Sequence, residues 1–238
     1  GCKLHYLDEV DSTNEYAKTI ARESSDWTVI IAETQTKGKG RLNRTWFSPR
    51  GGIWMSIILK SVGEGSYATV LTLFTGIAVA RALKELGLEV ALKWPNDILV
   101  NKKKLGGILS EWEPEANSTI IGIGLNINIS LDLFPQELHD SVTTTLHELK
   151  HEIDKNKLIE DLISEFKAIY TRFEKGQTEE LLLDWKKYSS MIGSEVEVDV
   201  VGKVYEGKAI DIDRDGSLIL LSRSGSEKKI IAGDVKIK

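Results

Sequence analysis

Apolar residues fall along the first part of the chain in short runs that are typical of buried strands. These runs cover residues 27–33, 52–59, 90–94, 98–100, 105–111 and 119–129. The fourth and fifth runs are close enough in sequence to form a hairpin. Residues 67–86 differ, because their apolar positions have helical spacing and the length of a core helix, with Gly87 as the stop signal.

Three other segments have the periodicity of an amphipathic helix. Residues 12–15 (Ser-Thr-Asn-Glu) have the spacing of a capping box, which predicts a helix from there to about residue 22. Asp154 is a typical N-cap for a second helix that ends near residue 174, and residues 177–188 predict a third. Together, the strands and helices predict an α+β fold in which helices cover a mixed sheet.

The pattern changes near residue 193, after which apolar and polar residues alternate with the period of a strand. The alternating runs cover residues 196–200, 209–212, 218–221 and 230–231, with turn signals at 213–216 and 224–226. Short strands over about 45 residues predict a small SH3-like β-barrel. We therefore expect two domains, a catalytic one over residues 1–191 and the barrel over residues 192–238.

Composition indicates the class of protein. The 238 residues are 41% hydrophobic and 28% charged, which is ordinary for a soluble globular protein. No apolar run approaches the roughly 20 residues of a membrane span, and the first residues lack a secretory signal, so no membrane partner is expected. Cys2 is the single cysteine, which rules out an internal disulfide and favours a reducing cytoplasm.

Residues 34–63 form a cationic segment in an acidic chain. They include six lysines or arginines and no acidic residue, whereas the whole chain has a net charge of −5. Local cations on an acidic protein favour a phosphate or carboxylate site over a nucleic-acid surface. Gly38 and Gly40 allow a tight turn whose N–H groups reach an anion. A solvated basic hairpin tip without a ligand is equally compatible with this segment.

Two later segments combine glycines with polar side chains. Residues 93–97 (Lys-Trp-Pro-Asn-Asp) end a predicted strand at a proline and offer ammonium, amide and carboxylate groups. Lys104 precedes two glycines in the next strand, and residues 122–126 (Gly-Ile-Gly-Leu-Asn) repeat that arrangement. Glycines in a core strand indicate that something packs closely against its backbone. The asparagine and aspartate of the first segment are also frequent turn formers.

Together these segments resemble the biotin–protein ligase family over essentially the whole chain. The cationic segment carries the most specific match, Gly-Lys-Gly-Arg at residues 38–41 and Arg-Thr-Trp-Phe-Ser-Pro-Arg-Gly at residues 44–51. Residues 93–97, residues 104–107 and residues 122–126 match in the order expected for the family, and residues 12–14 and Gln35 also fit. Five ordered matches are far more specific than any single one.

Two positions depart from the family pattern. Lys39 stands where arginine is more frequent, which keeps the charge and loses the bidentate geometry. Asn43 stands where glycine is more frequent, which makes the closed form of the segment stiffer. The resemblance is to the form of the family without an N-terminal DNA-binding domain, because the matching pattern begins near residue 12. We therefore expect no DNA partner.

The resemblance implies an ATP-dependent ligase that acts in two steps. The biotin carboxylate attacks the α-phosphate of ATP to give biotinyl-5′-adenylate and pyrophosphate. A lysine amine of a biotin carboxyl carrier protein or domain then attacks this mixed anhydride. Because two anions must approach each other in the first step, cations are needed to neutralise them. The resemblance implies Arg41 and Lys104 as the catalytic residues, and Mg²⁺ as the ion that bridges the phosphates.

The same resemblance implies two groups of binding residues. The biotin-binding group is Ser12, Thr13, Asn14, Gln35, Lys39, Gly40, Arg41, Lys104 and Gly122. The group that binds ATP or the adenylate is Arg44, Trp46, Lys93, Asn96, Asp97 and Asn126. Trp46 is expected to cover the adenylate as residues 38–51 close and exclude water. Ser12 fits a helix cap equally well, and Asn96 and Asn126 equally fit local turns. Asp97 is also a candidate acceptor for the proton of the incoming lysine. A homodimer is also implied.

Other functions share parts of this pattern. Lipoate or octanoyl transfer enzymes share the general fold, but residues 44–49 and the C-terminal barrel favour biotin. A biotin-responsive DNA-binding regulator has the added N-terminal domain. A catalytically silent biotin-binding protein has no need of Arg41 and Lys104.

Residues 147–151 (His-Glu-Leu-Lys-His) match the zinc-peptidase pattern H-E-x-x-H. On a continuous helix the two histidines share one face, and Glu148 is placed to act as a base. Asp154 marks a new helix start soon afterwards, so we expect this pentapeptide to straddle a helix end and a loop. We therefore favour ligase chemistry and expect no structural metal site.

Overall fold

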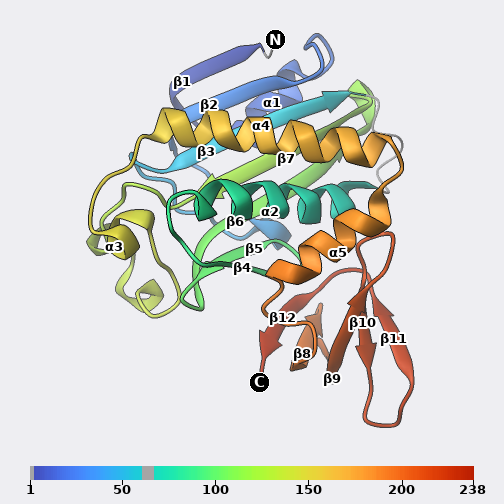
Figure 1. Ribbon diagram of the computed structural model, residues 1–238. Helices are drawn as coiled ribbons and strands as arrows, with labels where there is room; N and C mark the ends of the chain where they lie inside the picture. Colours follow the sequence, from blue (N-terminus) through green and yellow to red (C-terminus); the bar gives the residue numbers. More distant parts are fainter. Residues whose placement is uncertain (1–2, 61–66) are drawn as a thin grey trace.

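The computed structural model describes residues 3–60 and 67–238, so Cys2 lies outside the described residues, as does the side chain of Asn43. This part of the chain forms a seven-stranded sheet with helices on both faces and a second, five-stranded sheet beside it (Figure 1). The predicted α+β organisation, with a mixed sheet followed by a small β structure, is confirmed.

The large sheet contains every strand predicted for the first part of the chain. Its strands are β1 (Leu4–Val10), β2 (Thr28–Gln35), β3 (Ile53–Lys60), β4 (Val90–Lys93), β5 (Asp97–Val100), β6 (Lys103–Glu113) and β7 (Ser118–Leu125). Their spatial order is β1-β2-β3-β7-β6-β5-β4. β1 runs parallel to β2, and the other neighbouring pairs are antiparallel, including the predicted β5–β6 hairpin.

β1 is the one strand of this sheet that the sequence pattern missed. It lies at the edge, where Leu4 and Tyr6 are each 58% exposed. An edge strand without a buried apolar run lacks the signal that marks the inner strands.

The helices are α1 (Thr13–Ile20), α2 (Ala68–Lys84), α3 (Thr145–Leu149), α4 (Lys155–Glu174) and α5 (Thr178–Tyr188). The predicted core helix and the three amphipathic helices are all present. The capping box was wrong, because the Ser12 side chain makes no cap hydrogen bond with any described residue. Glu15 instead forms ion pairs with Lys18 and Lys39.

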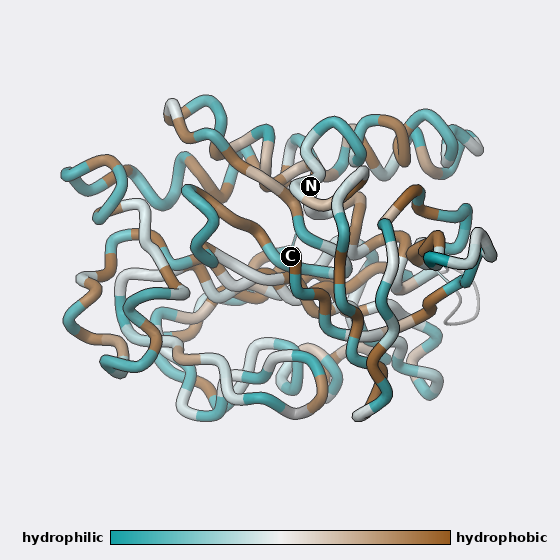
Figure 2. The backbone as a smooth tube through the Cα atoms, turned by 90° about the horizontal axis from the view of Figure 1, so that it is seen from below, coloured by the Kyte–Doolittle hydropathy of each residue, from teal (hydrophilic) through white to brown (hydrophobic). Residues whose placement is uncertain are grey.

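Strand alternation divides the apolar residues between the two faces of the sheet. α2 and α4 cover one face and bury the main core there (Figure 1). α1 lies on the opposite face, where Ala17 and the C-cap residue Ala21 pack against Ile30, Ile58 and Ile120 of three adjacent strands. Seen from the side of the small sheet, hydrophobic stretches run through the strands while the outer turns are mostly hydrophilic (Figure 2).

The small sheet is antiparallel and packs on the same core. Its strands are β8 (Glu195–Val200), β9 (Lys203–Ile212), β10 (Leu218–Leu221), β11 (Glu227–Ile230) and β12 (Asp234–Ile237), in the order β11-β10-β9-β8-β12. Trp94, just after β4, is fully buried, and its Nε1 donates to the Gly216 carbonyl oxygen in the β9–β10 turn at 2.8 Å. β12 was not predicted, and it proves to be the strand nearest the site.

Candidate active site

A pocket of about 1020 Å³ opens on the α1 face of the large sheet. Its walls come from the start of α1, the cationic segment, the β4–β5 turn, strands β6 and β7, and β12 of the small sheet. The side chains or backbones of all fifteen predicted site residues line this pocket. Residues from five separated parts of the sequence are thus brought together.

The cationic segment folds into a closed turn at the mouth of the pocket. Lys39 and Thr45 form an antiparallel bridge, and the Gly40 N–H donates to the Arg44 carbonyl oxygen at 2.7 Å. A short 3₁₀ turn (Arg41–Asn43) lies between them, with the left-handed conformation at Leu42 (φ 54°). A Cβ added at Gly40 would have its nearest neighbour, the Arg44 carbonyl oxygen, at an ordinary van der Waals distance of 3.6 Å, so packing within the protein does not require glycine here.

The six cations of the segment divide into two sets. Lys39, Arg41 and Arg44 line the pocket. The other three have partners elsewhere: Lys37 with Asp11 at 2.8 Å, Arg50 with Asp8 at 2.6 Å, and Lys60 with the Ala21 carbonyl oxygen. Half of the positive charge that the sequence concentrates here is therefore directed away from the site.

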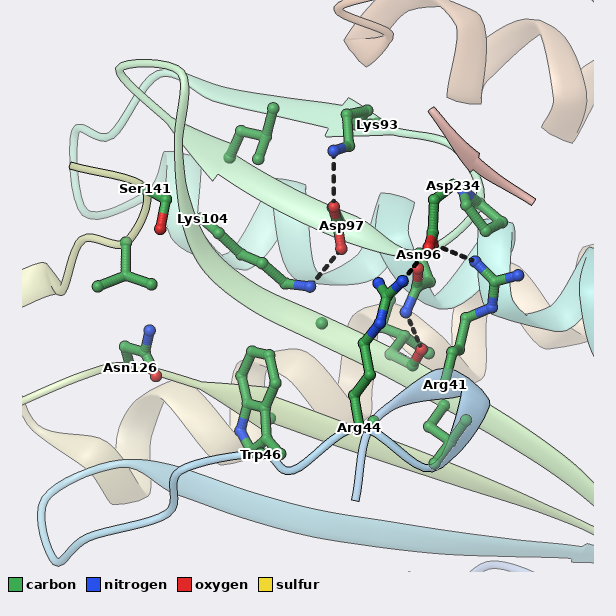
Figure 3. Close-up of a pocket in the computed structure, with 18 of the residues that line it drawn as sticks. Arg41, Arg44, Trp46, Lys93, Asn96, Asp97, Lys104, Asn126, Ser141 and Asp234 are labelled. Carbon is green, nitrogen blue, oxygen red and sulfur yellow. Dashed lines mark hydrogen bonds and ion pairs between the residues drawn. The ribbon is translucent and has the colours of Figure 1, made fainter. Parts of the chain in front are cut away.

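Two carboxylates organise four cations in the pocket (Figure 3). Asp97 lies 3.0 Å from Lys93 Nζ and 2.5 Å from Lys104 Nζ. Asp234, at the start of β12, pairs with Arg44 and lies 3.9 Å from Arg41. Arg41 also donates to the Gly233 carbonyl oxygen at 3.2 Å. The cations are held near one another by acidic groups that an incoming anion can replace.

The protonation of this cluster follows from burial and charge. Burial alone would raise the pKa of the Asp97 carboxyl, but the charges of Lys104 and Lys93 outweigh it, so the pKa lies below its ordinary value. Burial lowers the pKa of the Arg41 guanidinium, and Asp234 and Asp97 oppose that effect. Asp97 is therefore ionised at neutral pH and is a weaker base than a free aspartate.

Trp46 lies below Lys104 in the pocket (Figure 3). Lys104 Nζ lies 5.1 Å from the centre of its ring. A Cβ added at Gly124 would lie 2.7 Å from Trp46 Nε1, so the glycine of β7 makes room for the indole. Trp46 Nε1 is buried and has no hydrogen-bond partner among the described residues. The glycines in the core strands predicted that something packs closely against them. At Gly124 that group is Trp46, a side chain of the protein itself.

Hydrogen bonds of the two site asparagines support local structure. Asn96 Nδ2 donates to the Ile108 carbonyl oxygen at 2.9 Å, and Asn126 Nδ2 donates to the Thr143 carbonyl oxygen at 3.2 Å. Asn126 Oδ1 is buried and accepts from none of the described groups. Asn126 therefore keeps one acceptor for a ligand, while Asn96 anchors the β4–β5 turn.

The polar end of the pocket is formed by Ser12, Thr13, Asn14 and Gln35. The Thr13 N–H donates to Gln35 Oε1 at 2.8 Å, which ties the start of α1 to the end of β2. Asn14 lies directly over Gly122, where an added Cβ would be 2.3 Å from Asn14 Oδ1. A side chain at position 122 is thus incompatible with the present place of Asn14.

Gly122→Ala is expected to weaken ligand binding at this end about tenfold, because Asn14 must move and lose its buried hydrogen bonds. Ligand titration of the two proteins measures the effect. Gly76→Ala is the matched control, since its Cβ has ordinary contacts at 3.4 Å and a helix interior favours alanine. Equal affinities of the Gly122 variant and the wild type would contradict this reading.

Among the six charged residues of the two ion-pair groups, Asp234 is the one that the sequence analysis did not predict. It lies 190 residues after its partner Arg44. The only local signal was an aspartate after a glycine, in a strand that was itself not predicted. A Gly-Asp pair by itself does not indicate a binding or catalytic role. Contact across the two sheets identifies it.

The H-E-x-x-H pentapeptide straddles a helix end, as predicted. α3 ends at Leu149, and Lys150 adopts the left-handed conformation (φ 65°) before His151. The two histidines therefore do not share a helical face, and Glu148 accepts from Asn101 Nδ2 at 2.6 Å.

Within residues 3–60 and 67–238, no three histidine, cysteine or acidic side chains are grouped as metal ligands. None of the helices described is long and apolar enough to cross a membrane.

Comparison with known proteins gives a consistent picture. The family model described as "Biotin/lipoate A/B protein ligase family" matches residues 6–128, and the model "Biotin protein ligase C terminal domain" matches residues 191–237. The bifunctional ligase/repressor BirA of Bacillus spizizenii is 35% identical over 100% of this chain and 74% of its own length. The biotin–[acetyl-CoA-carboxylase] ligase of Mycobacterium tuberculosis is 33% identical over 98% of this chain and 88% of its length.

Among solved structures, the biotin protein ligase of Aquifex aeolicus in complex with biotin and ATP is similar over the whole fold. It superposes with a TM-score of 0.88 at 29% identity, covering 99% of this chain and 98% of that one. The similarity therefore extends over both sheets as well as the pocket.

Proposed function

The chain belongs to the biotin/lipoate A/B protein ligase family, and we propose that it is a biotin–protein ligase. It activates biotin with ATP and transfers the biotinyl group to a lysine of a biotin carboxyl carrier protein or domain. The observation that carries the proposal is the pocket that gathers four cations around two carboxylates beside an uncharged polar end. A neutral ring, a carboxylate and a triphosphate match these two environments.

In the first step, a biotin carboxylate oxygen bonds to the α-phosphorus of ATP, and the bond to the bridging oxygen breaks to release pyrophosphate. Negative charge gathers on the phosphate oxygens as the two anions meet. Lys104 and Arg41 are placed to stabilise that charge, with Arg44 and Lys93 on the outer phosphates. Before ATP arrives, the ion pair with Asp234 orients the Arg44 guanidinium. The phosphates of ATP then replace Asp234 as the partner of Arg44.

In the second step, the amine nitrogen of the carrier lysine bonds to the biotinyl carbonyl carbon, the bond from that carbon to the phosphate oxygen breaks to release AMP, and the amine proton passes to solvent. Asp97 forms ion pairs with Lys93 and Lys104, and its lowered pKa makes it a weak base. We therefore assign it the role of orienting these two lysines. Trp46 covers the adenylate and keeps water from the anhydride while the carrier docks.

The biotin end consists of Ser12, Thr13, Asn14, Gln35 and Gly122, with Lys39 and Gly40 at the rim. Apart from Lys39, which pairs with Glu15 at 3.1 Å, these groups are neutral, which suits the uncharged ureido ring of biotin. Asn96 and Asn126 lie on the adenine side. Mg²⁺ belongs to the proposal as part of the substrate, because triphosphates bind as their magnesium complexes.

Three further features complete the proposal. The C-terminal family match at residues 191–237 supports a division into domains at residues 1–191 and 192–238. A homodimer formed through β1, an edge strand of the large sheet, is part of it. The single cysteine supports a cytoplasmic location.

Incubation with ATP, Mg²⁺ and biotin is expected to release pyrophosphate and leave biotinyl-adenylate on the protein. Lipoate, offered in parallel, is expected to react at least about 100-fold less efficiently, because it lacks the N–H groups that the polar end recognises. Pyrophosphate release and mass spectrometry of the bound adenylate are the measurements. Preference for lipoate would assign the chain to the other branch of the family.

A further inference from the structure

The pocket carries far more positive than negative charge, whereas the substrates of the two proposed steps differ in sign. Among the described residues, eight lysines or arginines line the pocket, against three aspartates, Asp97, Asp140 and Asp234. Biotin and ATP are anions, which this excess of cations attracts. The proposed acceptor is a lysine, whose amine has an ordinary pKa of about 10.4 and therefore arrives as an ammonium ion. Once pyrophosphate has left, the same cations repel that ammonium.

Two of the three aspartates are already occupied by cations of the protein. Asp97 forms ion pairs with Lys93 at 3.0 Å and with Lys104 at 2.5 Å. Asp234 forms an ion pair with Arg44. After pyrophosphate leaves, both carboxylates again face these cations, so neither of them presents an unpaired negative charge to an incoming lysine.

Asp140 is the one pocket aspartate without such a partner in the part of the chain that the structure describes. It follows the short 3₁₀ turn η5 (Gln136–Leu138), and its side chain is exposed. None of the described lysines and arginines forms an ion pair with it, including Lys102, which also lines the pocket. Asp140 therefore keeps an unpaired carboxylate for a cation that arrives from solvent.

The backbone on both sides of Asp140 is fixed against the start of β6. The Lys103 ammonium donates to the His139 carbonyl oxygen at 2.9 Å. The Lys104 N–H donates to the Ser141 carbonyl oxygen at 2.8 Å. Figure 3 shows Ser141 beside Lys104, on the opposite side of the pocket from the two labelled arginines. Asp140 therefore has a defined place at the rim, next to a residue that contacts Lys104 and away from the arginines.

We propose that Asp140 receives the acceptor lysine of the carrier: its carboxylate attracts the ammonium to the side of the pocket away from the arginines, from where the lysine reaches the adenylate. This inference rests on the proposed function, which supplies both the adenylate and the cationic acceptor. Asp140 takes no part in the bond changes of the second step, before which the ammonium gives one proton to solvent. Because it is a charge at the rim, Asp140 acts mainly on the encounter with the acceptor.

Transfer from the preformed adenylate tests the proposal. The protein is loaded with biotin, ATP and Mg²⁺, freed of excess ligand and mixed with Nα-acetyl-lysine methylamide, a small acceptor with one ammonium group. Asp140→Asn is expected to lower the second-order rate constant of transfer about fivefold and to leave the pyrophosphate burst of the first step within about twofold. Glu137→Gln, at an exposed carboxylate that does not line the pocket, is the matched control. An unchanged rate constant in Asp140→Asn overturns the proposal.

Hydroxylamine gives a readout that a purely structural role of Asp140 would not produce. This nucleophile is uncharged at neutral pH, so the carboxylate does not attract it. The rate of biotinyl-hydroxamate formation is therefore expected to stay within about twofold of the wild type in Asp140→Asn and in Asp140→Lys. Asp140→Lys is expected to slow transfer to the lysine probe at least about tenfold, because a cation at the rim repels the ammonium. Equal losses with both nucleophiles overturn the proposal.

A purified biotin carboxyl carrier domain extends the test to a protein acceptor. Its kcat/KM is expected to fall about fivefold in Asp140→Asn, through KM, and the difference from the wild type is expected to shrink as NaCl is raised, because salt screens exposed charges. A loss in kcat with KM unchanged overturns the proposal. If the wild type forms no biotinyl-adenylate, the proposed function itself fails; if it does and the Asp140 variants transfer normally to the lysine probe, only this inference fails.

Discussion

Replacing Lys104 with alanine is expected to slow the formation of biotinyl-adenylate by about 10²- to 10³-fold, the usual effect of losing one oriented charge at a reacting centre. The ammonium lies 2.5 Å from Asp97 and over the ring of Trp46, so its position in the pocket is defined from two sides. Its backbone is fixed independently, because the Lys104 N–H donates to the Ser141 carbonyl oxygen at 2.8 Å. The substitution therefore removes charge without moving the strand.

Single-turnover pyrophosphate release measures this effect. Lys103→Ala is the matched control, because the Lys103 ammonium donates to the His139 carbonyl oxygen at 2.9 Å and does not line the pocket. Asp97 keeps Lys93 as a partner in the Lys104 variant, so a large loss of stability is not expected. A burst of normal rate and amplitude in Lys104→Ala would remove this residue from the catalytic group.

Replacing Trp94 with alanine is expected to lower the free energy of unfolding by about 3–5 kcal/mol, the usual cost of deleting a buried aromatic side chain. The indole is fully buried, and its N–H is the partner of the Gly216 carbonyl oxygen in the small sheet. The substitution leaves a cavity at the junction of the two sheets and an unpaired carbonyl. Both effects act at the contact between the large sheet and the β9–β10 turn.

Urea unfolding followed by circular dichroism measures the change. Trp94→Phe keeps most of the packing and loses only the hydrogen bond, so a cost of about 1–2 kcal/mol is expected. Leu183→Ala, at a position that is 56% exposed, should change stability by less than about 0.5 kcal/mol. A loss below about 1 kcal/mol in Trp94→Ala would show that the two sheets hold together without this contact.

The cation cluster shows how far local patterns reach. Lys93, Asp97 and Lys104 lie within one short stretch of sequence, and their motif already placed them beside one another. What the motif did not contain is the direction of each side chain. Lys37 and Arg50 belong to the same charged segment as Arg41, yet acidic residues of β1 and of the turn after it draw them away from the pocket. Net charge along a sequence carries no information about such pairing.

The sequence by itself predicted the inner strands, the main helices and fifteen of the residues that line the pocket, because periodicity marks the elements and short motifs mark the residues through the family resemblance. The tertiary structure alone decided the partners of those residues. Asp234 reaches Arg44 from the last strand, and Glu111 reaches Asn14 from a neighbouring sheet position 97 residues away. Hydrogen bonds and ion pairs form between groups that packing brings within about 3 Å, and separation along the chain does not encode that distance.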